Sequence, residues 1–366
     1  MGFRTAKSIY KRSSNSLEAV QRNAWAVGSV LNADIKSDAD LPISKRLDAL
    51  QSGFTSESYA LFELDRRDRS DYLSDWERAR GASKINKGYE ITLDDKLLSH
   101  RILSPEYGEL LPDLYGCLQD GEFVEPWEGA TADCDSLIEC VRKHKIVVIK
   151  PRAGTRGKRI LFLQYDDGFL LDGEPISETR LTQICRNLDG YLATEVFHPA
   201  QYANEIHPSG FSTVRAITMV DPDTGKPFIG GAMHRFSTDK SAPLDNYAAG
   251  GGSAGIDRES GELSHFVIVK DNGRPEYMET HPDTGTQVLN VEIPAWSKIR
   301  TQILELADAV SSITPYLGLD LIVLDDKGSV GLIEANSLPG VQAMQAHKPL
   351  LRDDRNRRFY EYHGAL

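Results

Sequence analysis

The stretch GLDLIVLDDKGSVGLIEANSLPG, residues 318–340, predicts a β-hairpin and is the starting point for the whole fold. Two apolar runs that favour strands, LDLIVL and SVGLIEA, flank the segment Asp-Asp-Lys-Gly at 325–328. That segment has the residue types that form turns between strands. The Ser-Leu-Pro-Gly that follows the second run ends the strand abruptly.

Three oxygen-bearing side chains of this hairpin can meet at one point. Glu334 and Asn336 are two residues apart on the second run, so they point to the same face of the strand. Asp320 lies near the start of the first run and can reach that face across the hairpin. Their oxygens suit Mg²⁺ held between protein and phosphates. A surface hairpin with solvated acids would also explain the spacing, but Glu334 lies inside an apolar run, so we expect a cationic partner for it.

The pattern of an Asp and, further on, Glu-Ala-Asn-Ser-Leu-Pro-Gly resembles the metal-binding end of the ATP-grasp superfamily, whose usual form is D…E-(V/A)-N-x-x-P-G. The match includes both carboxylates, the Asn, the Pro and the Gly. Upstream, GFTSESYALFELDRRDRSDYLSDWE…KINKGYEITLDDK resembles the leader of the sugar-transfer-associated ATP-grasp family. That family is named for its genomic company with surface-polysaccharide enzymes. The resemblance runs from about Gly53 to about Gly340.

Length and composition narrow the class of protein. The chain has 366 residues, which is enough for two or three domains or subdomains. Its net charge of −12 argues against nucleic acid as the main partner, because phosphate binding needs a basic face. The 4 cysteines show no CxxC and no paired metal spacing, and predict reduced thiols in a cytoplasmic protein. No apolar run approaches the roughly 20 residues that span a bilayer, so we expect no transmembrane segment.

Residues 145–165, KIVVIKPRAGTRGKRILFLQY, predict a strand, a glycine-rich loop and a second strand. Gly154 and Gly157 let the loop backbone approach phosphate oxygens, and Lys150 adds positive charge beside it. The loop is neither a Walker A motif nor G-x-G-x-x-G, and an ordinary basic hairpin is the alternative. It resembles the ATP-grasp loop that closes over the β- and γ-phosphates. The resemblance also implies that Lys96, otherwise a surface lysine, reaches the phosphates.

The segment YLATEVFHP, residues 191–199, predicts a strand that leads into a bend. In ATP-grasp folds this segment is the hinge between two lobes, and the adenine meets backbone groups just after a Glu. The resemblance assigns that place to Glu195, with Phe197 as an apolar wall; a buried strand end is an equally good local explanation. The family usually has a second Glu further on for the ribose. Glu205 or Ser212 could take its place here.

Two arginines and a glycine-rich segment complete the predicted site. Arg215 lies within the strand-like run STVRAITM, where a buried guanidinium needs an anionic partner. That partner is either a structural carboxylate, for which Glu205 is a candidate, or, as the resemblance implies, the transferred phosphoryl group or acyl-phosphate. Residues 229–257 carry Arg235, which could hold a substrate carboxylate. The glycine-rich part of this segment, with Asn246, predicts a loop that covers the substrate.

We therefore expect an α+β protein with the ATP-grasp fold, in which two α+β lobes clasp ATP. The expected divisions are 1–94 for a helical N-terminal region that packs as a cap on the later part, 95–197 for the small lobe and 198–366 for the large lobe. Apolar residues in 294–317 recur at helical spacing, which predicts a core helix. The basic tail after residue 346 predicts a last helix, which could form a contact in a homodimer.

The chemistry that the resemblance implies is ATP-dependent ligation of a carboxylate to an amine, with Mg²⁺. The carboxylate attacks the γ-phosphate to give an acyl-phosphate and ADP, and the amine then displaces phosphate to form an amide. The family's genomic company points to cell-surface polysaccharide or related sugar/amino-acid conjugate biosynthesis. A small-molecule kinase and a non-catalytic nucleotide-binding partner of glycosyltransferases are the alternatives. Three intact oxygen ligands argue against the second alternative.

Overall fold

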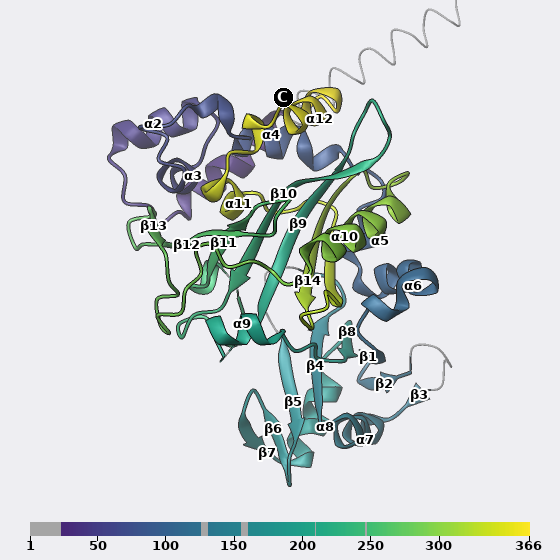
Figure 1. Ribbon diagram of the computed structural model, residues 1–366. Helices are drawn as coiled ribbons and strands as arrows, with labels where there is room; N and C mark the ends of the chain where they lie inside the picture. The colour runs from purple at the N-terminus through teal and green to yellow at the C-terminus, as the bar shows by residue number, and fades with distance from the viewer. Residues whose placement is uncertain (1–22, 126–130, 155–159, 209, 246) are drawn as a thin grey trace, which may run out of the picture.

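The structure, a computed structural model, describes residues 23–125, 131–154, 160–208, 210–245 and 247–366 (Figure 1). Two antiparallel β-sheets form the body of the protein, and helices pack around them. Each sheet uses a continuous part of the chain: the first lies within 114–194 and the second within 212–336. The expected α+β class is therefore confirmed.

The first sheet has eight strands in the order β3-β2-β1-β8-β4-β5-β6-β7. Helices α7 (Cys134–His144) and α8 (Glu178–Asn187) share one apolar core with it, to which Val141 and Leu181 contribute fully buried side chains. Its strands are β1 (Leu114–Gln119), β2 (Glu122–Val124), β3 (Thr131–Ala132), β4 (Ile146–Pro151), β5 (Leu161–Tyr165), β6 (Phe169–Leu171), β7 (Glu174–Ile176) and β8 (Tyr191–Thr194).

The second sheet has seven strands in the order β13-β12-β11-β10-β9-β14-β15. β14 and β15 form the predicted hairpin at one edge, and the Asp325 carboxylate accepts hydrogen bonds from the amides of Lys327 (2.9 Å) and Ser329 (3.0 Å) in its turn. The strands are β9 (Ser212–Val220), β10 (Pro227–Phe236), β11 (Gly252–Ile256), β12 (Leu263–Val269), β13 (Pro275–Met278), β14 (Tyr316–Val323) and β15 (Val330–Asn336).

Helices cover both faces of the second sheet because β9 presents apolar side chains alternately to each side. Ala216 belongs to the core under α10 (Trp296–Val310), the helix predicted from its apolar spacing. Its neighbour Ile217 belongs to the opposite core, which includes residues of α11 (Gln342–His347) and α12 (Asp354–Tyr362). The C-terminal tail is thus helical, as expected, and its apolar side chains are buried within the same chain.

The N-terminal helices pack on the second sheet and its C-terminal helices, as the sequence predicts for a helical cap. One core joins Tyr59 and Phe62 to Ala346, and another joins Leu73 to Tyr360. Figure 1 shows α2, α3 and α4 beside α11 and α12 at one end of the molecule. Residues 23–35 are helical, and the remaining elements are α2 (Ile43–Gln51), α3 (Ser56–Leu61), η1 (Arg69–Asp71), α4 (Asp75–Arg80), η2 (Ala82–Lys84), α5 (Ile91–Asp94), α6 (Lys96–Tyr107), η3 (Gly108–Leu110), α9 (Gln201–Ile206), η4 (Tyr247–Ala249) and η5 (Leu350–Arg352).

One element differs from the sequence prediction. The glycine-rich stretch after Asp245 was expected to be a loop, but residues 252–256 form β11, an interior strand that is buried throughout. The glycines serve close packing there. A Cβ atom on Gly252 would lie 2.1 Å from the ring of Phe266, and one on Gly255 would lie 2.9 Å from the Cβ of His347. The small residues make room for large neighbours.

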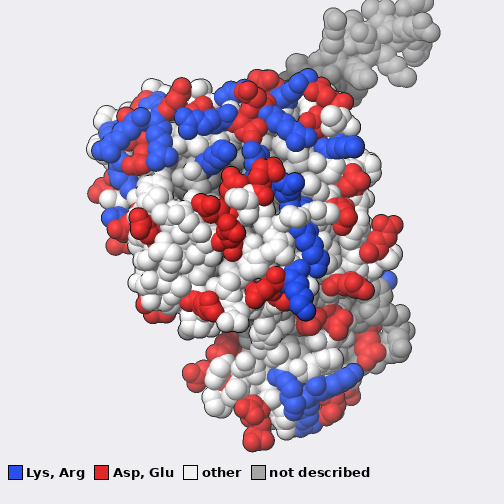
Figure 2. Space-filling view, viewed as in Figure 1, with Lys and Arg blue, Asp and Glu red and all other residues white. Residues whose placement is uncertain are grey.

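Three general properties bear on the expectations from composition. None of the helices in the described part of the chain is long and apolar enough to cross a bilayer. All four cysteines have free thiols. Figure 2 shows Lys and Arg interspersed with Asp and Glu on the face in view, including the helical end that holds α2, α4 and α12.

Candidate active site

A cavity of about 1360 Å³ lies between the two sheets and gathers most of the predicted site residues. Its walls come from β4 and the segment after it, from the segment after β8, and from the central strands and edge hairpin of the second sheet. A second hollow, of about 730 Å³, lies over Tyr115 and His144 and contains none of the predicted residues. The predicted residues that line the larger cavity are Lys150, Gly154, Glu195, Phe197, Arg215, Arg235, Asp320, Glu334 and Asn336.

The pairing of three strands places an arginine and two carboxylates in one row. Asp320 on β14 lies opposite Arg215 on β9 and opposite Glu334 on β15. Directly opposite residues of an antiparallel pair share a face, so all three side chains reach the cavity. Asn336, which lies two residues beyond Glu334, joins them on this face. The hairpin therefore brings the predicted oxygen ligands together.

Asp320 is held by two arginines. Both of its oxygens accept hydrogen bonds from Arg215, through Nε and, at 2.5 Å, through Nη2. Nη2 of Arg235 lies 3.4 Å from Oδ2. Burial alone would raise the pKa of Asp320, but the charges of Arg215 and then Arg235 outweigh burial and hold the pKa below its ordinary value. Asp320 is thus a buried carboxylate at neutral pH. The structural alternative of a pair between Arg215 and Glu205 is wrong.

Glu334 has the cationic partner that its apolar surroundings predicted. Nζ of Lys96 lies 3.0 Å from Oε1 of Glu334, and it also donates a hydrogen bond to the carbonyl oxygen of Gly154 (3.1 Å). One lysine therefore connects the hairpin of β14 and β15 to the start of the glycine-rich loop. Nδ2 of Asn336 is buried without a hydrogen-bond partner among the described residues. A buried amide group that faces a cavity without a hydrogen-bond partner can be satisfied by a bound ligand.

Asp95 explains why Lys96 can span these two segments. Its carboxylate caps α6 by accepting from the amides of Leu97 (3.0 Å) and Leu98 (3.1 Å). The same carboxylate accepts from Nε of Arg152 just after β4, at 2.7 Å and 2.9 Å. The amide of Lys96 in turn donates to the carbonyl of Arg152. Asp95 was not predicted, although an Asp before an apolar helix is the usual signal of a cap.

Lys150 is the second cation on the phosphate side, and it is buried with only 7% of its surface exposed. Within the described part of the chain it forms no ion pair of its own. Burial, and then the charge of Lys96, lower the pKa of Lys150 to about 8, although Glu334 opposes the shift. A buried ammonium group with this pKa, aimed into a cavity, favours an anionic ligand.

Arg235 belongs to a small polar network on β9 and β10. It donates to Oγ1 of Thr213 from Nε (2.9 Å) and from Nη2 (2.6 Å), and its Nε lies 3.4 Å from Oδ2 of Asp245. The hydroxyl of Thr213 donates to that same carboxylate oxygen. Thr213 and Asp245 therefore orient Arg235 toward Asp320. Neither residue was predicted, because Asp245 reaches the site only through the return of the chain after β10.

The other end of the cavity is apolar. Glu195 does not face it freely, since its carboxylate accepts from the amide of Asp113 (3.1 Å) and its own amide donates to the carbonyl of Asp113 (2.9 Å). This pairing fixes the bend after β8 and leaves Phe197 packed over Gly331 of β15, where a Cβ atom would come within 2.3 Å of the ring. The stacked rings of Phe162 and Phe211, 5.3 Å between centroids, form another wall. A flat base would fit such a slot.

Lys96 does not line this cavity itself, although its ammonium group pairs with Glu334, which does. Four other residues named from the sequence do not line the cavity or fall outside the described residues. Glu205 lies on the exposed side of α9, where it accepts from Nε2 of Gln201 (2.7 Å), and it does not line the cavity. Its assignment to the ribose is therefore not supported, because α9 points it to solvent. The hydroxyl of Ser212 is buried without a partner in the described residues and does not line the cavity either. Gly157 and Asn246 lie outside the described residues.

The N-terminal region supplies part of the site, which sequence analysis missed. Arg78 of α4 lines the cavity and donates from Nη2 to the carbonyl of Pro339 at 3.2 Å. Both oxygens of Asp94 accept from Ser337, at 2.9 Å from its amide and at 2.8 Å from its hydroxyl. Nδ2 of Asn86 donates to the carbonyl of Ser337 (2.6 Å). The Ser-Leu-Pro-Gly turn is thus fixed by residues more than 200 positions away.

The chemistry of the site fits a divalent cation with a nucleotide triphosphate. Asp320, Glu334 and Asn336 offer hard oxygen donors of the type that Mg²⁺ prefers. Lys96 and Lys150 offer ammonium groups of the type that contact phosphates. In the structure these carboxylates pair with Lys96, Arg215 and Arg235.

Comparisons with known proteins identify a family for the chain. A model described as sugar-transfer associated ATP-grasp matches residues 77–356. No curated protein matches the chain. Among solved structures it is similar to D-cycloserine synthetase (9% identity, 85% of this chain, 82% of that chain, TM-score 0.42), to D-alanine-D-alanine ligase from Coxiella burnetii (12%, 85%, 67%, 0.37) and to N5-carboxyaminoimidazole ribonucleotide synthetase (10%, 70%, 48%, 0.37).

The chain spans about half of the length of the last of these proteins, 48%. The family model, by contrast, covers well over half of this chain and includes β1 to β15 and the whole hairpin. The two antiparallel sheets with their helical N-terminal region are the ATP-grasp fold. The chain therefore belongs to the sugar-transfer associated ATP-grasp family.

Proposed function

We propose that this protein is an ATP-dependent ligase that joins a carboxylate to an amine through an acyl-phosphate. The observation that carries the proposal is the row of Arg215, Asp320 and Glu334, which the pairing of β9, β14 and β15 sets into one wall of the cavity. Lys96 and Lys150 face this row from the other lobe. Phosphoryl transfer requires carboxylates that hold a metal ion and, opposite them, cations that hold the phosphates.

In this proposal the small lobe holds the phosphates and the large lobe holds the metal. Lys96, Lys150 and the loop that begins at Gly154 contact the phosphate oxygens, while the base lies between the apolar walls near Phe197. Asp320, Glu334 and Asn336 hold one or two Mg²⁺ ions. A bound Mg²⁺ would neutralise charge on the phosphates.

The ion pairs of the structure suggest how the cations of the protein are used. Arg215 and Arg235 now neutralise Asp320, and Lys96 neutralises Glu334. In this proposal the same cations also contact anionic oxygens of the substrates. Arg215 stabilises the transferred phosphoryl group, and Arg235 holds the substrate carboxylate.

The reaction proceeds in two balanced steps. A carboxylate oxygen forms a bond to the γ-phosphorus while the bond from that phosphorus to the β,γ-bridging oxygen breaks, which releases ADP. The amine nitrogen then forms a bond to the acyl carbon, the carbon–oxygen bond to phosphate breaks, and the amine loses a proton. The products are an amide, ADP and inorganic phosphate.

The substrates belong at the end of the cavity that the N-terminal region closes. Lys36, Glu57 and Arg78 line it there, together with Lys270 and Asp271 from beyond β12. Charged groups of both signs suit a polar substrate such as a uronic acid or an amino acid. The family description adds sugar transfer as the setting, and we propose cell-surface polysaccharide or related conjugate biosynthesis. Free thiols are consistent with a reaction in the cytoplasm.

We also propose the division 1–94, 95–197 and 198–366, with ATP bound between the last two parts. It is supported by the separation of the two sheets along the chain. The first part is a helical region whose cores are shared with the large lobe. Its Arg78 and Asp94 contacts make it a structural support for the metal hairpin.

The experiment is product analysis with Mg-ATP and pooled sugar acids, with and without hydroxylamine. Hydroxylamine converts acyl-phosphates to hydroxamates. We expect hydroxamate together with equal amounts of ADP and phosphate, which would also identify the carboxylate. ADP with a stable phosphorylated product and no hydroxamate would mean a small-molecule kinase. Measurable ATP binding without turnover on any acid of the pool would point to the non-catalytic partner of glycosyltransferases.

Glu334→Gln is the matched test of the metal assignment. It keeps the shape of the side chain but removes the charge, so ATP turnover should fall at least about 100-fold while the fold is retained. Asp326→Asn removes an exposed carboxylate from the turn of the same hairpin and should leave turnover unchanged. Equal activity of the Glu334 variant and the wild type would show that Glu334 is not a metal ligand.

A further inference from the structure

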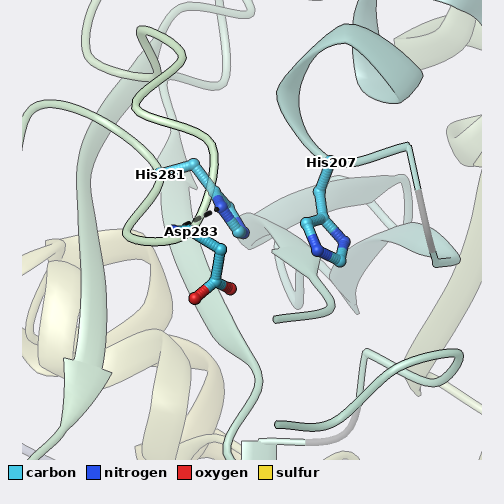
Figure 3. A group of neighbouring side chains, drawn as sticks. All are labelled: His207, His281 and Asp283. Carbon is cyan, nitrogen blue, oxygen red and sulfur yellow. Dashed lines mark hydrogen bonds between the residues drawn. The ribbon is translucent and has the colours of Figure 1, made fainter. Parts of the chain in front are cut away.

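A second polar cluster lies outside the cavity, beside the C-terminal end of β10. His207 follows α9, while His281 and Asp283 lie in the turn between β13 and α10. Each offers one ligand atom, and these atoms all lie within 4.8 Å of one another. Figure 3 shows the His207 ring facing the His281–Asp283 pair across a narrow gap. None of the three lines the cavity.

One residue, Ser237, fixes both imidazole rings. Nε2 of His281 lies 2.9 Å from the carbonyl oxygen of Ser237, and a carbonyl can only accept, so Nε2 carries the proton. Nδ1 of His281 therefore carries a lone pair, which accepts a long hydrogen bond from the amide of Asp283 (3.4 Å). A metal ion at Nδ1 would replace that bond. Nδ1 of His207 lies 2.8 Å from the Ser237 hydroxyl. Nε2 of His207 faces the carboxylate of Asp239, so without a metal ion Nε2 donates and Nδ1 accepts from the hydroxyl. Metal binding at Nε2 requires the other tautomer, in which Nδ1 donates to the Ser237 hydroxyl.

Two carboxylates lie beside the rings at the surface. Oδ1 of Asp239 lies 3.3 Å from Nε2 of His207, and Oδ2 of Asp283 accepts from the amide of Asp239 at 2.9 Å. The His207 side chain is 2% exposed and that of Asp239 is 75% exposed. Two buried imidazoles thus form the floor of a small site whose rim is acidic and open to ions.

The His281 ring lies in an apolar environment. The ring of Phe266 packs against it with centroids 5.0 Å apart. Metal-ligating histidines are stabilised by an apolar wall and by a hydrogen bond to the ring nitrogen that faces away from the metal.

We propose that Nε2 of His207, Nδ1 of His281 and the carboxylate of Asp283 bind a Zn²⁺ ion, with Asp239 as the fourth ligand. Two imidazoles and two carboxylates give a tetrahedral set of nitrogen and oxygen ligands. This set suits Zn²⁺, whereas Mg²⁺ prefers oxygen ligands only. Ligand atoms of a tetrahedral site with bonds of about 2.0–2.1 Å lie closer together than 4.8 Å. The exposed Asp283 side chain can close that gap by a rotamer change.

The position of the site gives the ion a structural role. Ser237 and Asp239 begin the segment that leaves β10 and returns Asp245 to the network of Arg235 and Thr213. The ion would tie the start of this segment to α9 and to the turn before α10, three connections that are distant in sequence. It would thereby stabilise the path that carries Asp245 and Lys240 to the cavity.

The experiment uses untagged full-length protein, stripped with a chelator and titrated with Zn²⁺ alone by calorimetry and by competition with a chromophoric chelator. We expect one strongly bound ion, with a Kd below about 1 μM, and a raised melting temperature. Asp283→Asn keeps the exposed position and the size of the side chain, so the fold should survive while Zn²⁺ affinity falls at least about tenfold. Ser237→Ala should also weaken binding, by about 10- to 100-fold, although every ligand remains.

Two matched variants separate this site from other places where Zn²⁺ could bind. His265→Asn removes an exposed histidine of β12 and should bind Zn²⁺ as the wild type does. Glu334→Gln alters the predicted Mg²⁺ site and should leave the strong Zn²⁺ site intact. The proposal is overturned if the wild type binds no stoichiometric Zn²⁺, or if binding is unchanged in Asp283→Asn and lost in Glu334→Gln. Neither result bears on the ligase proposal, which hydroxylamine trapping tests separately.

Discussion

At the scale of single residues, the two acids of the hairpin differ in what they do for the fold. Asp320 is 4% exposed and paired with Arg215, whose side chain is 12% exposed. Glu334 retains more solvent, with 19% of its side chain exposed, and its partner Lys96 is 12% exposed. Removing one member of a buried pair leaves the other charge unpaired, which costs far more than breaking a pair that water can reach.

We therefore expect Asp320→Asn to lower the free energy of unfolding by about 3–5 kcal/mol, because Arg215 would be left buried and without its carboxylate. Glu334→Gln, the matched variant, should change the same free energy by about 1 kcal/mol or less. Denaturant unfolding of the two variants measures the difference. Equal stabilities would mean that Arg215 finds another anion or becomes hydrated.

Lys150 predicts a pH dependence of nucleotide binding. Its pKa is about 8 in the free protein, and an adjacent phosphate would raise that pKa because it favours the charged form. Binding then takes up a proton above pH 8, so ATP affinity should fall as the pH rises, by about tenfold between pH 7 and pH 9. Calorimetry at several pH values measures this.

Lys150→Arg is the control for that titration, because a guanidinium stays charged over the whole range. Its ATP affinity should lose the decline above pH 8 even if the absolute affinity changes. The same decline in both proteins would assign the pH dependence to another group.

At the scale of elements, the sequence predicts those whose signals are local. The hairpin of β14 and β15 and the helix α10 were recognised from alternation, turn chemistry and helical spacing. β11 was missed because a run of Gly, Ser and Ala has no apolar alternation, and its burial depends on the rings of other strands. Glu205 was misassigned because the helix that turns it to solvent lies in the insertion where the family pattern fails.

The packing of β11 makes a direct prediction. Gly252→Ala places a Cβ atom 2.1 Å from the Phe266 ring, and that ring is fully buried and cannot move away cheaply. We expect the free energy of unfolding to fall by about 1–3 kcal/mol. Gly168→Ala is the matched control, since nothing lies within 4 Å of its added Cβ and its φ is not positive. Thermal or denaturant unfolding measures the stability of both variants. Equal stabilities would refute the packing of β11 as a buried interior strand.

At the scale of the whole molecule, the N-terminal region and the hairpin of β14 and β15 form one structure. Arg78, Asn86 and Asp94 all bond to the turn that ends β15. No local pattern could reveal this, since each partner lies far along the chain and most of the bonds use a backbone group. The sequence therefore predicts the hairpin but not the residues that hold it in position.

Gln345 tests whether these parts unfold together. Its side chain is 1% exposed and clamps Leu73, accepting from the Leu73 amide at 2.8 Å and donating to the Leu73 carbonyl at 3.0 Å. Gln345→Ala would leave both backbone groups buried without partners, so we expect a loss of about 2–4 kcal/mol. If the N-terminal region and the large lobe are one cooperative unit, fluorescence and circular dichroism should still report a single transition at lower denaturant.

Gln342→Ala, which loses only a half-buried bond to Ser58, should cost about 1 kcal/mol. A separate early transition in the Gln345 variant would instead mean that the helical cap unfolds independently and that the hairpin keeps its position without it.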